Sequence, residues 1–183
     1  MPSSKQTGPL QVRAAVPEDA RRFAEIHVAA WKVAYKGLIE QETIDALSIE
    51  EKVISWLKVL TSPNPGTRIT VCELNGVVVA WSTHGPCRDG NDRLRLGEVA
   101  EGEIHGLYAH PDAWGVGAGA ALLSDALEYL DRLWPSSVVW VLTKNSRARL
   151  CYERAGFKVV KEHVYFERHP EATTTMLRRQ REA

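Results

Sequence analysis

The stretch YAHPDAWGVGAGAALL, residues 108–123, places three glycines at alternate positions between a proline and an apolar, helix-like run. Glycine loses more conformational entropy on folding than any other residue, so its repeated use indicates that the backbone approaches another group closely. Residues 103–110, EIHGLYAH, which precede the glycines, are typical of a compact strand. The residues after the glycines place apolar side chains at helical spacing. The sequence therefore predicts a strand, a glycine turn and a helix that begins near Gly117.

This arrangement predicts an anion site, because the first N–H groups of a helix lack internal acceptors and its dipole adds positive charge there. Gly115, Gly117 and Ala120 match the dinucleotide fingerprint G-x-G-x-x-G/A. That fingerprint also requires an acidic residue at the end of the next strand, where this chain has Lys144 and Asn145. A phosphate-binding loop requires Gly-Lys-Ser or Gly-Lys-Thr, which the sequence lacks. Both designs are therefore rejected, and a phosphate or pyrophosphate remains the expected ligand.

The rest of the chain alternates strand and helix patterns around this unit. An Asn-Gly pair at 75–76 between two apolar runs is a strong hairpin signal. In the first helix, a core stripe is expected at Phe23, Ile26, Ala30 and Val33. The predicted order is a strand (10–16), a helix (17–37), one or two helices (39–60, broken near 48), a hairpin (68–74 and 76–85), a strand (103–110), a helix (to 134), a strand (136–145), a helix (146–156) and two strands (157–167, 173–179). This order predicts one mixed α/β layer fold.

Composition narrows the class of protein. The 183 residues include 44% hydrophobic and 25% charged residues, with 23 basic and 23 acidic side chains, so neither a nucleic-acid partner nor a membrane span is expected. The three cysteines, Cys72, Cys87 and Cys151, are odd in number and widely spaced, which argues against a disulfide framework and a metal site. We expect a flexible tail at residues 1–9, a single domain at 10–183, a reducing cytoplasm and no metal.

Two motifs together resemble the GNAT superfamily of acyl-CoA-dependent N-acetyltransferases. Its signature, Gln/Arg-x-x-Gly-x-Gly/Ala, is matched by Gly117 and Gly119, with Trp114 where Gln or Arg is usual. The segment NSRARLCYERAGF, residues 145–157, resembles a second family motif, with Cys151 in place of Phe. The resemblance implies a mostly antiparallel central sheet of about six to seven strands, with helices on both faces and a splay between the fourth and fifth strands.

The resemblance also implies how acetyl-CoA binds. The pantetheine arm lies in the splay against the backbone of the strand at 103–110, and the pyrophosphate lies on the amides of the glycine turn. The far side of the channel matches the second motif. The implied cofactor-binding residues are Leu107, Tyr108, Ala109, Trp114, Gly115, Val116, Gly117, Ala118, Gly119, Ala120, Asn145, Ala148 and Tyr152.

The implied reaction is direct transfer of acetyl from acetyl-CoA to a primary amine. Tyr152 matches the family's general acid, and the amide of Leu107 is the expected oxyanion donor. The base is expected from Glu103, acting directly or through water, with His105 second; a period of two places both on one face of the strand. A covalent route through Cys151 is disfavoured, because adjacent helical residues point about 100° apart and Tyr152 already faces the thioester.

The acceptor pocket is expected against the first helix. His27, Trp31 and Tyr35 fall on one helical face, and Trp81 and His84 would complete the wall. Aromatic side chains hold amines by cation–π contact, although the same aromatics also pack in ordinary cores. The acceptor's identity and the formation of a homodimer remain open. Because Trp114 departs from the signature, an alternative to the enzyme remains open, namely a non-catalytic CoA-binding or regulatory module.

Overall fold

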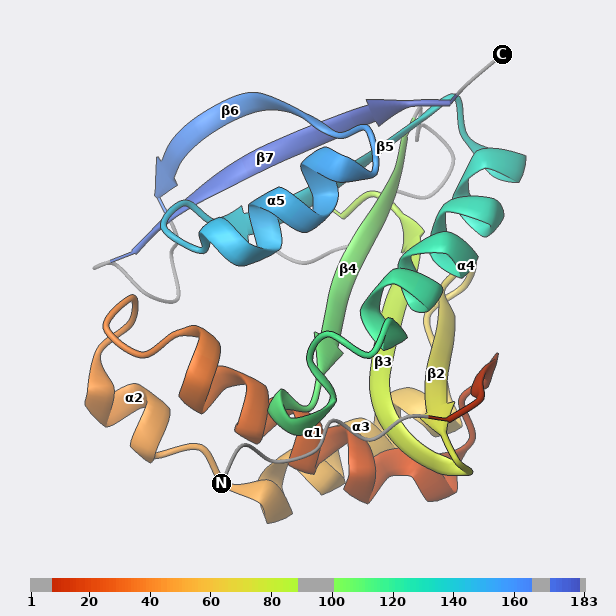
Figure 1. The fold of residues 1–183 in the computed structure, drawn as a ribbon, viewed down its shortest axis with the longest axis vertical. Helices are drawn as coiled ribbons and strands as arrows, with labels where there is room; N and C mark the ends of the chain where they lie inside the picture. The colour runs from red at the N-terminus through yellow and green to blue at the C-terminus, as the bar shows by residue number, and fades with distance from the viewer. Residues whose placement is uncertain (1–7, 89–100, 166–171, 182–183) are drawn as a thin grey trace.

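The computed structural model describes residues 8–88, 101–165 and 172–181. In these ranges seven strands form one sheet in the order β1-β2-β3-β4-β5-β7-β6. Figure 1 shows β4 running through the middle of the molecule, with β5–β7 and α5 at one end and α1–α3 at the other. The elements are β1 (Leu10–Ala14), η1 (Pro17–Asp19), α1 (Ala20–Ala34), α2 (Gln41–Asp45), α3 (Ile49–Thr61), β2 (Arg68–Leu74), β3 (Val77–Pro86), β4 (Glu101–Ala109), η2 (Pro111–Ala113), α4 (Ala118–Leu133), β5 (Ser136–Leu142), α5 (Ser146–Arg154), β6 (Lys158–Tyr165) and β7 (Thr173–Gln180).

The sheet is antiparallel except between β4 and β5, which run parallel. Their pairing covers only Glu101–Ile104 against Ser136–Val139. Beyond these residues the ladder between β4 and β5 stops, while β4 continues to pair with β3 as far as Ala109. The mixed fold, the strand count and the splay between the fourth and fifth strands are thus confirmed.

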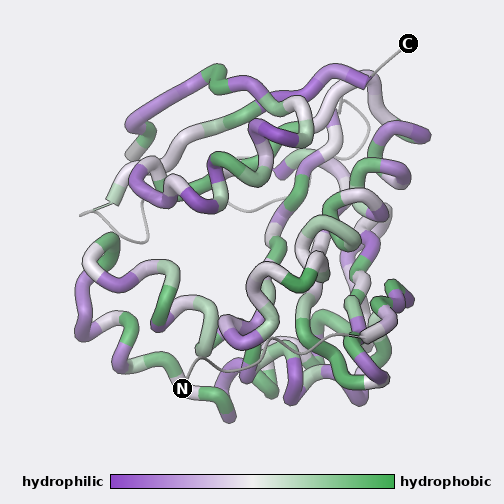
Figure 2. The backbone as a smooth tube through the Cα atoms, viewed as in Figure 1, coloured by the Kyte–Doolittle hydropathy of each residue, from purple (hydrophilic) through white to green (hydrophobic). Residues whose placement is uncertain are grey.

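Helices cover both faces of the sheet. On one face, Phe23 and Ile26 of α1 pack with Val71 and Trp81. On the other face, α4 packs with the residues that alternate with these, such as Cys72 and Ala80. A further cluster joins α4 and α5 over the second half of the sheet. Figure 2 shows hydrophobic residues along the central strands and hydrophilic residues on the outer turns at the end of α4.

The local signals account for most element boundaries. Asn75 and Gly76 both have positive φ, +53° and +78°, as the predicted two-residue hairpin requires. Ser48 separates α2 from α3 and accepts a hydrogen bond from the Glu51 amide as an N-cap. Gly156, with φ +89°, ends α5 as predicted. The sequence therefore encodes these turns locally.

Two predictions at the N-terminal end were wrong in detail. The first strand ends at Ala14 rather than Val16. Val33, expected in the core stripe, is 51% exposed, so the packing that covers Phe23 and Ile26 does not continue to the last turn of α1. The division into a tail and a single domain stays a prediction, and residues 1–7 lie outside the described ranges. None of the helices in the described ranges is long and apolar enough to cross a membrane.

Candidate active site

A cavity of about 770 Å³ lies where β4 and β5 separate. Its walls are the end of β4, the glycine turn with the start of α4, the middle of β5, and α5. The residues that sequence analysis predicted for the cofactor and that line this cavity are Leu107, Tyr108, Ala109, Trp114, Gly115, Gly117, Ala118, Gly119, Ala120, Asn145, Ala148 and Tyr152. Val116 instead packs against the core cluster beneath α4. The two sequence motifs, far apart in the chain, therefore form opposite walls of one cavity.

The glycine turn has the backbone geometry that only glycine adopts easily. Gly115 and Gly117 have φ of +86° and +97°, and Gly117 is the N-cap of α4. Gly119 has ordinary helical backbone, and a Cβ there would lie 3.8 Å from Leu107, an ordinary van der Waals contact, so neither backbone strain nor a clash with the described residues requires glycine there. The first N–H groups of α4 have no intrahelical acceptors and belong to residues that line the cavity.

The end of β4 presents backbone groups to the same space. The His110 amide donates to Val79 of β3 at 2.8 Å. Because successive residues of a strand point their N–H and C=O groups to opposite sides, the corresponding groups of Leu107 and Ala109 point away from β3, toward the gap where pairing with β5 has stopped. This is the position expected for an oxyanion donor and for backbone partners of an extended ligand.

The charged groups on the cavity wall are cationic. Arg147 and Arg154 of α5 line it, whereas no carboxylate does within the part of the chain that the structure describes. The guanidinium carbon of Arg147 lies 3.8 Å from the centre of the Trp114 ring. Trp114 is itself anchored, since its Nε1–H donates to the Ala109 carbonyl at 2.9 Å. The cavity is therefore electrostatically suited to an anionic ligand.

Tyr152 is a buried residue of α5 that lines the cavity. Burial, followed by the nearby Cys151 and Tyr108, raises the pKa of its hydroxyl, which is thus fully protonated at neutral pH. Its helix is started by Asn145, whose side chain accepts a hydrogen bond from the Ala148 amide at 3.1 Å. A protonated hydroxyl on a capped helix can serve as a proton donor.

Two further tyrosines meet in the cavity from different elements. The hydroxyls of Tyr35, at the end of α1, and Tyr108, on β4, lie 3.5 Å apart. Burial chiefly raises the pKa of Tyr35, with additional effects from Tyr108 and Tyr152. From the sequence, Tyr108 was expected only as a backbone partner, because a strand pattern does not indicate which residue a tyrosine hydroxyl will meet.

A β-bulge separates the two predicted bases. On β3, Thr83 pairs with Gly106 and His84 with Ile104, so His105 is an extra residue in β4. The expectation that Glu103 and His105 share one face was therefore wrong, because the bulge breaks the period of two. Gly106 was a usable signal, since glycine inside a strand often marks a bulge. A Cβ there would lie 3.1 Å from the Tyr108 ring.

The two residues consequently have different surroundings. Glu103 is 1% exposed and does not line the cavity; one carboxylate oxygen accepts from the Arg88 side chain at 2.7 Å and the other from the Arg88 amide at 2.7 Å. His105 lines the cavity, and its Nε2–H donates to the Pro86 carbonyl at 2.9 Å, so Nδ1 carries the lone pair. Burial, and then Arg88, lower the pKa of His105.

The aromatic residues of α1 form a stacked cluster next to the cavity. The ring of His27 lies 5.2 Å from Trp31 and 5.3 Å from Tyr108, centre to centre. Burial, with a smaller effect from Lys52, lowers the pKa of His27 to about 3, so the ring is neutral. Of the predicted acceptor residues on α1, only Tyr35 lines the cavity itself.

Neither of the two remaining predicted acceptor residues lines the cavity. Trp81 is 1% exposed, stacks on Phe23 and donates its Nε1–H to the Phe23 carbonyl, so it is a core residue. Its ring also lies 6.0 Å from that of His27 and 4.7 Å from that of Tyr108, so it packs beneath the aromatic cluster. His84 lies on the opposite face of the sheet, 5.4 Å from the ring of Tyr129 in α4. The structure therefore does not bring His84 together with His27 and Trp31, because the sheet lies between them.

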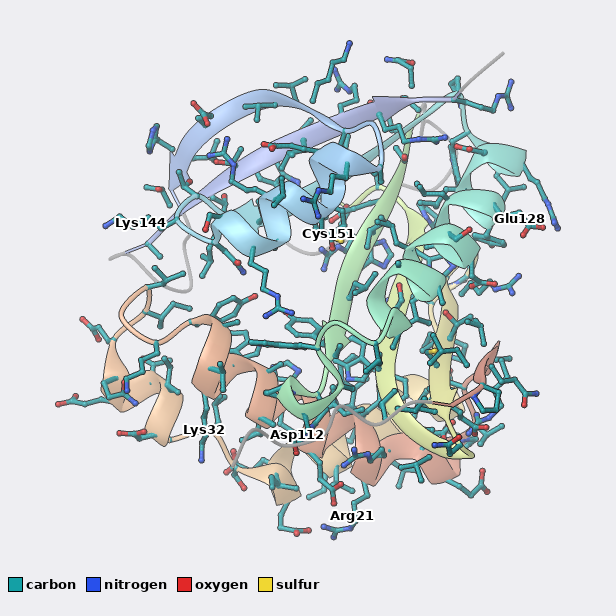
Figure 3. The ribbon with its side chains drawn as sticks, in the orientation of Figure 1. Arg21, Lys32, Asp112, Glu128, Lys144 and Cys151 are labelled. Carbon is teal, nitrogen blue, oxygen red and sulfur yellow. The ribbon has the colours of Figure 1, made fainter. Side chains whose placement is uncertain are left out.

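Cys151 is exposed and also lines the cavity (Figure 3). Neighbouring atoms desolvate its sulfur and raise the pKa of the thiol, an effect that Arg147 and Arg154 only partly oppose. A raised thiol pKa reduces the thiolate fraction that a covalent route needs. No group of three or more His, Cys, Asp and Glu side chains arranged for a metal ion occurs in the ranges that the structure describes.

Two contacts of the site were not predicted from the sequence. Arg88 hydrogen-bonds to Glu103, and Arg147 lies over the Trp114 ring; in each pair the residues are distant in the chain, so only the fold brings them together. The sequence showed that Trp114 departs from the family signature, but it did not reveal the neighbouring Arg147. A helix pattern does not indicate which exposed arginine faces a neighbouring loop.

The chain matches the acetyltransferase (GNAT) family over residues 22–157. An uncharacterized N-acetyltransferase of Archaeoglobus fulgidus is 31% identical over 144 residues, covering 78% of this chain and 89% of that protein. The PaiA N-acetyltransferase of Thermoplasma acidophilum, solved with coenzyme A, aligns with a TM-score of 0.71 at 16% identity, covering 94% and 99% of the two chains. The yncA protein of Salmonella typhimurium, solved with acetyl-CoA, aligns with a TM-score of 0.67 at 21% identity, covering 94% of each.

Proposed function

The chain belongs to the acetyltransferase (GNAT) family, and we propose that it transfers the acetyl group of acetyl-CoA to a primary amine by direct attack. The observation that carries the proposal is the single cavity in which the glycine turn, the open edge of β4 and Tyr152 meet. Its cationic lining favours the phosphates of the donor. The open backbone edge of β4 favours an extended pantetheine arm, which can add there as a strand would.

In this proposal each catalytic step has a residue of this chain. The Leu107 amide donates to the carbonyl oxygen of the thioester as negative charge develops there. His105 Nδ1 accepts the proton of the attacking amine, and Tyr152 donates a proton to the departing sulfur as the C–S bond breaks. The neutral His105 and the protonated Tyr152 suit these roles, since burial lowers the pKa of the first and raises that of the second.

We propose His105 rather than Glu103 as the base. A carboxylate held on both oxygens by Arg88 has little capacity left to take a proton, and Glu103 does not line the cavity. The imidazole lines the cavity and keeps one nitrogen available. Glu103 then acts structurally, because its carboxylate ties the segment that carries Arg88 to β4.

The acceptor side of the cavity is proposed at Tyr35 and Tyr108, backed by the cluster of His27 and Trp31. Aromatic faces and hydroxyls recognise an amine without requiring a carboxylate on the wall. The acceptor itself stays open.

Acetylation is tested by measuring release of free CoA thiol from acetyl-CoA across a panel of primary amines. Wild type is expected to release thiol with at least one amine, and Tyr152→Phe to lower kcat by about 10²- to 10⁴-fold while leaving acetyl-CoA binding within about threefold. Binding of acetyl-CoA without turnover of any amine would support the rival function, a CoA-binding module. Equal kcat for wild type and Tyr152→Phe would contradict the role of Tyr152.

A further inference from the structure

Trp114 lies at the position where the family signature has Gln or Arg. A cationic side chain from another element, Arg147 of α5, lies against it. The Arg147 guanidinium lies over the Trp114 ring, with 3.8 Å between its central carbon and the ring centre. Trp114 belongs to the turn after β4, and Arg147 to the first turn of α5, so the pair joins the two motif-bearing walls of the cavity. Tryptophan is the best aromatic partner for such a cation.

The pair leaves the hydrogen-bonding edge of Arg147 available. A guanidinium that stacks uses its flat face, and its N–H groups point outward in its plane. Arg147 makes no ion pair with any residue in the described ranges, whereas Arg149 of the same helix pairs with Glu153 and Glu162. The ring is itself fixed by its Nε1–H bond to the Ala109 carbonyl. Within the described ranges, Arg147 is therefore a cation without an ion-pair partner that lies on the Trp114 ring and lines the same cavity as the glycine turn.

We propose that Arg147, held on the Trp114 ring, donates hydrogen bonds to a phosphate group of the acyl-CoA donor and supplies the polar contact that residue 114 lacks. Trp114 acts as its positioning residue. Arginine suits this task because its fork matches two phosphate oxygens at once. The inference rests on the proposed function, since it assumes that the cavity binds acyl-CoA.

The first test compares acetyl-CoA dissociation constants for wild type, Arg147→Ala and Lys144→Ala by calorimetry. Lys144 is a matched control: it is exposed, carries the same charge, precedes α5 and does not line the cavity (Figure 3). Arg147→Ala is expected to weaken binding about 10- to 100-fold, the effect of losing charge-assisted hydrogen bonds, and Lys144→Ala less than about twofold. Equal affinities of wild type and Arg147→Ala overturn this inference alone. Absence of binding by folded wild type overturns the proposed function as well.

The second test identifies the phosphate. Dephospho-CoA lacks the 3′-phosphate and keeps the pyrophosphate, and acetyl-pantetheine lacks both. If Arg147→Ala weakens the binding of dephospho-CoA as much as that of acetyl-CoA, Arg147 contacts the pyrophosphate. If the substitution leaves the binding of dephospho-CoA unchanged, Arg147 contacts the 3′-phosphate. Either result supports the proposal. An equal weakening of acetyl-pantetheine binding or use would mean that the substitution deforms the cavity, and the proposal falls.

The role of Trp114 is tested by a double-mutant cycle with acetyl-CoA affinity as the readout. If Trp114 orients Arg147, the loss caused by Arg147→Ala shrinks several-fold in a Trp114→Ala background. Trp114→Phe keeps a ring and loses the Nε1–H bond, so it is expected to retain part of the coupling. Strictly additive losses would show that Trp114 does not position Arg147.

Discussion

Glu103 and His105 are two residues apart, yet the fold gives one a buried ion pair and the other a place on the cavity wall. The sequence led us to expect Glu103 first and His105 second as the base, whereas we propose His105. The proposed ranking depends on a β-bulge at His105 and on the distant Arg88, and neither follows from a period of two. At the residue scale, sequence indicated which chemistry was present, and packing determined which group is available for it.

The two candidate bases are separated by His105→Ala and Glu103→Gln. His105→Ala is expected to lower kcat about 10²- to 10⁴-fold, because it removes the proton acceptor. It is also expected to cost about 0.5 to 1.5 kcal/mol of unfolding free energy, because it removes the hydrogen bond to the Pro86 carbonyl. Glu103→Gln is expected to keep kcat within about tenfold and to cost about 1 to 3 kcal/mol of unfolding free energy, because an amide cannot replace the carboxylate toward Arg88. Steady-state turnover and thermal unfolding measure both. The reverse pattern, an inactive Glu103→Gln beside an active His105→Ala, would restore Glu103 as the base.

At the scale of the element, the strand, turn and helix around Gly117 could be read almost completely from the sequence. Positive φ at two glycines and a helix that begins at Ala118 follow from local rules that tertiary packing did not override. The same rules make the start of α4 electropositive. Anion binding and helix stability therefore depend on the same backbone groups, and one substitution can change them in opposite directions.

Substitutions of Ala120 can separate the effect of a negative charge on helix stability from its effect on anion binding. Ala120 is exposed, lines the cavity and lies in the first turn of α4. Compared with Ala120→Gln, Ala120→Glu is expected to raise the free energy of unfolding by about 0.3 to 1 kcal/mol, because its charge complements the helix dipole. Thermal unfolding at low salt measures the difference. A lower stability of the Glu variant would mean that the start of α4 is not the electropositive site described here.

At the scale of the whole molecule, the order of elements was predicted from periodicity and turn residues, and the splayed sheet was implied by the family resemblance of the two motifs. The acceptor wall was not. Trp81 proved to be a core residue, and His84 lies on the opposite face because residues three apart in an uninterrupted strand point to opposite sides of the sheet. Contacts between distant segments, such as Arg147 with Trp114, could not be predicted because they depend on how the elements pack.

Burial of neutral histidines gives the molecule a predictable sensitivity to acid. The pKa of His27 is about 3, below the ordinary 6.5, so the unfolded chain binds a proton that the folded chain does not. Stability is then full above pH 6.5 and is lost as pH falls toward 3. Acidification from about pH 6 to 4 is expected to lower the free energy of unfolding less steeply in His27→Phe than in wild type, by about 1.4 kcal/mol per pH unit. Urea unfolding at several pH values measures it, and identical slopes would contradict a neutral, buried His27.

Binding of the acetyl-CoA phosphates by the glycine turn can be measured by calorimetric titration of acetyl-CoA into wild type, Ala120→Gln and Ala120→Glu, with NAD as the control ligand. If the glycine turn holds the phosphates, wild type and the Gln variant bind acetyl-CoA in preference to NAD. The Glu variant, although folded and no less stable, is expected to lose that binding, because its carboxylate repels the phosphates at the helix start. Failure of folded wild type to bind acetyl-CoA, or equal affinity of the Glu and Gln variants, would contradict this role of the glycine turn.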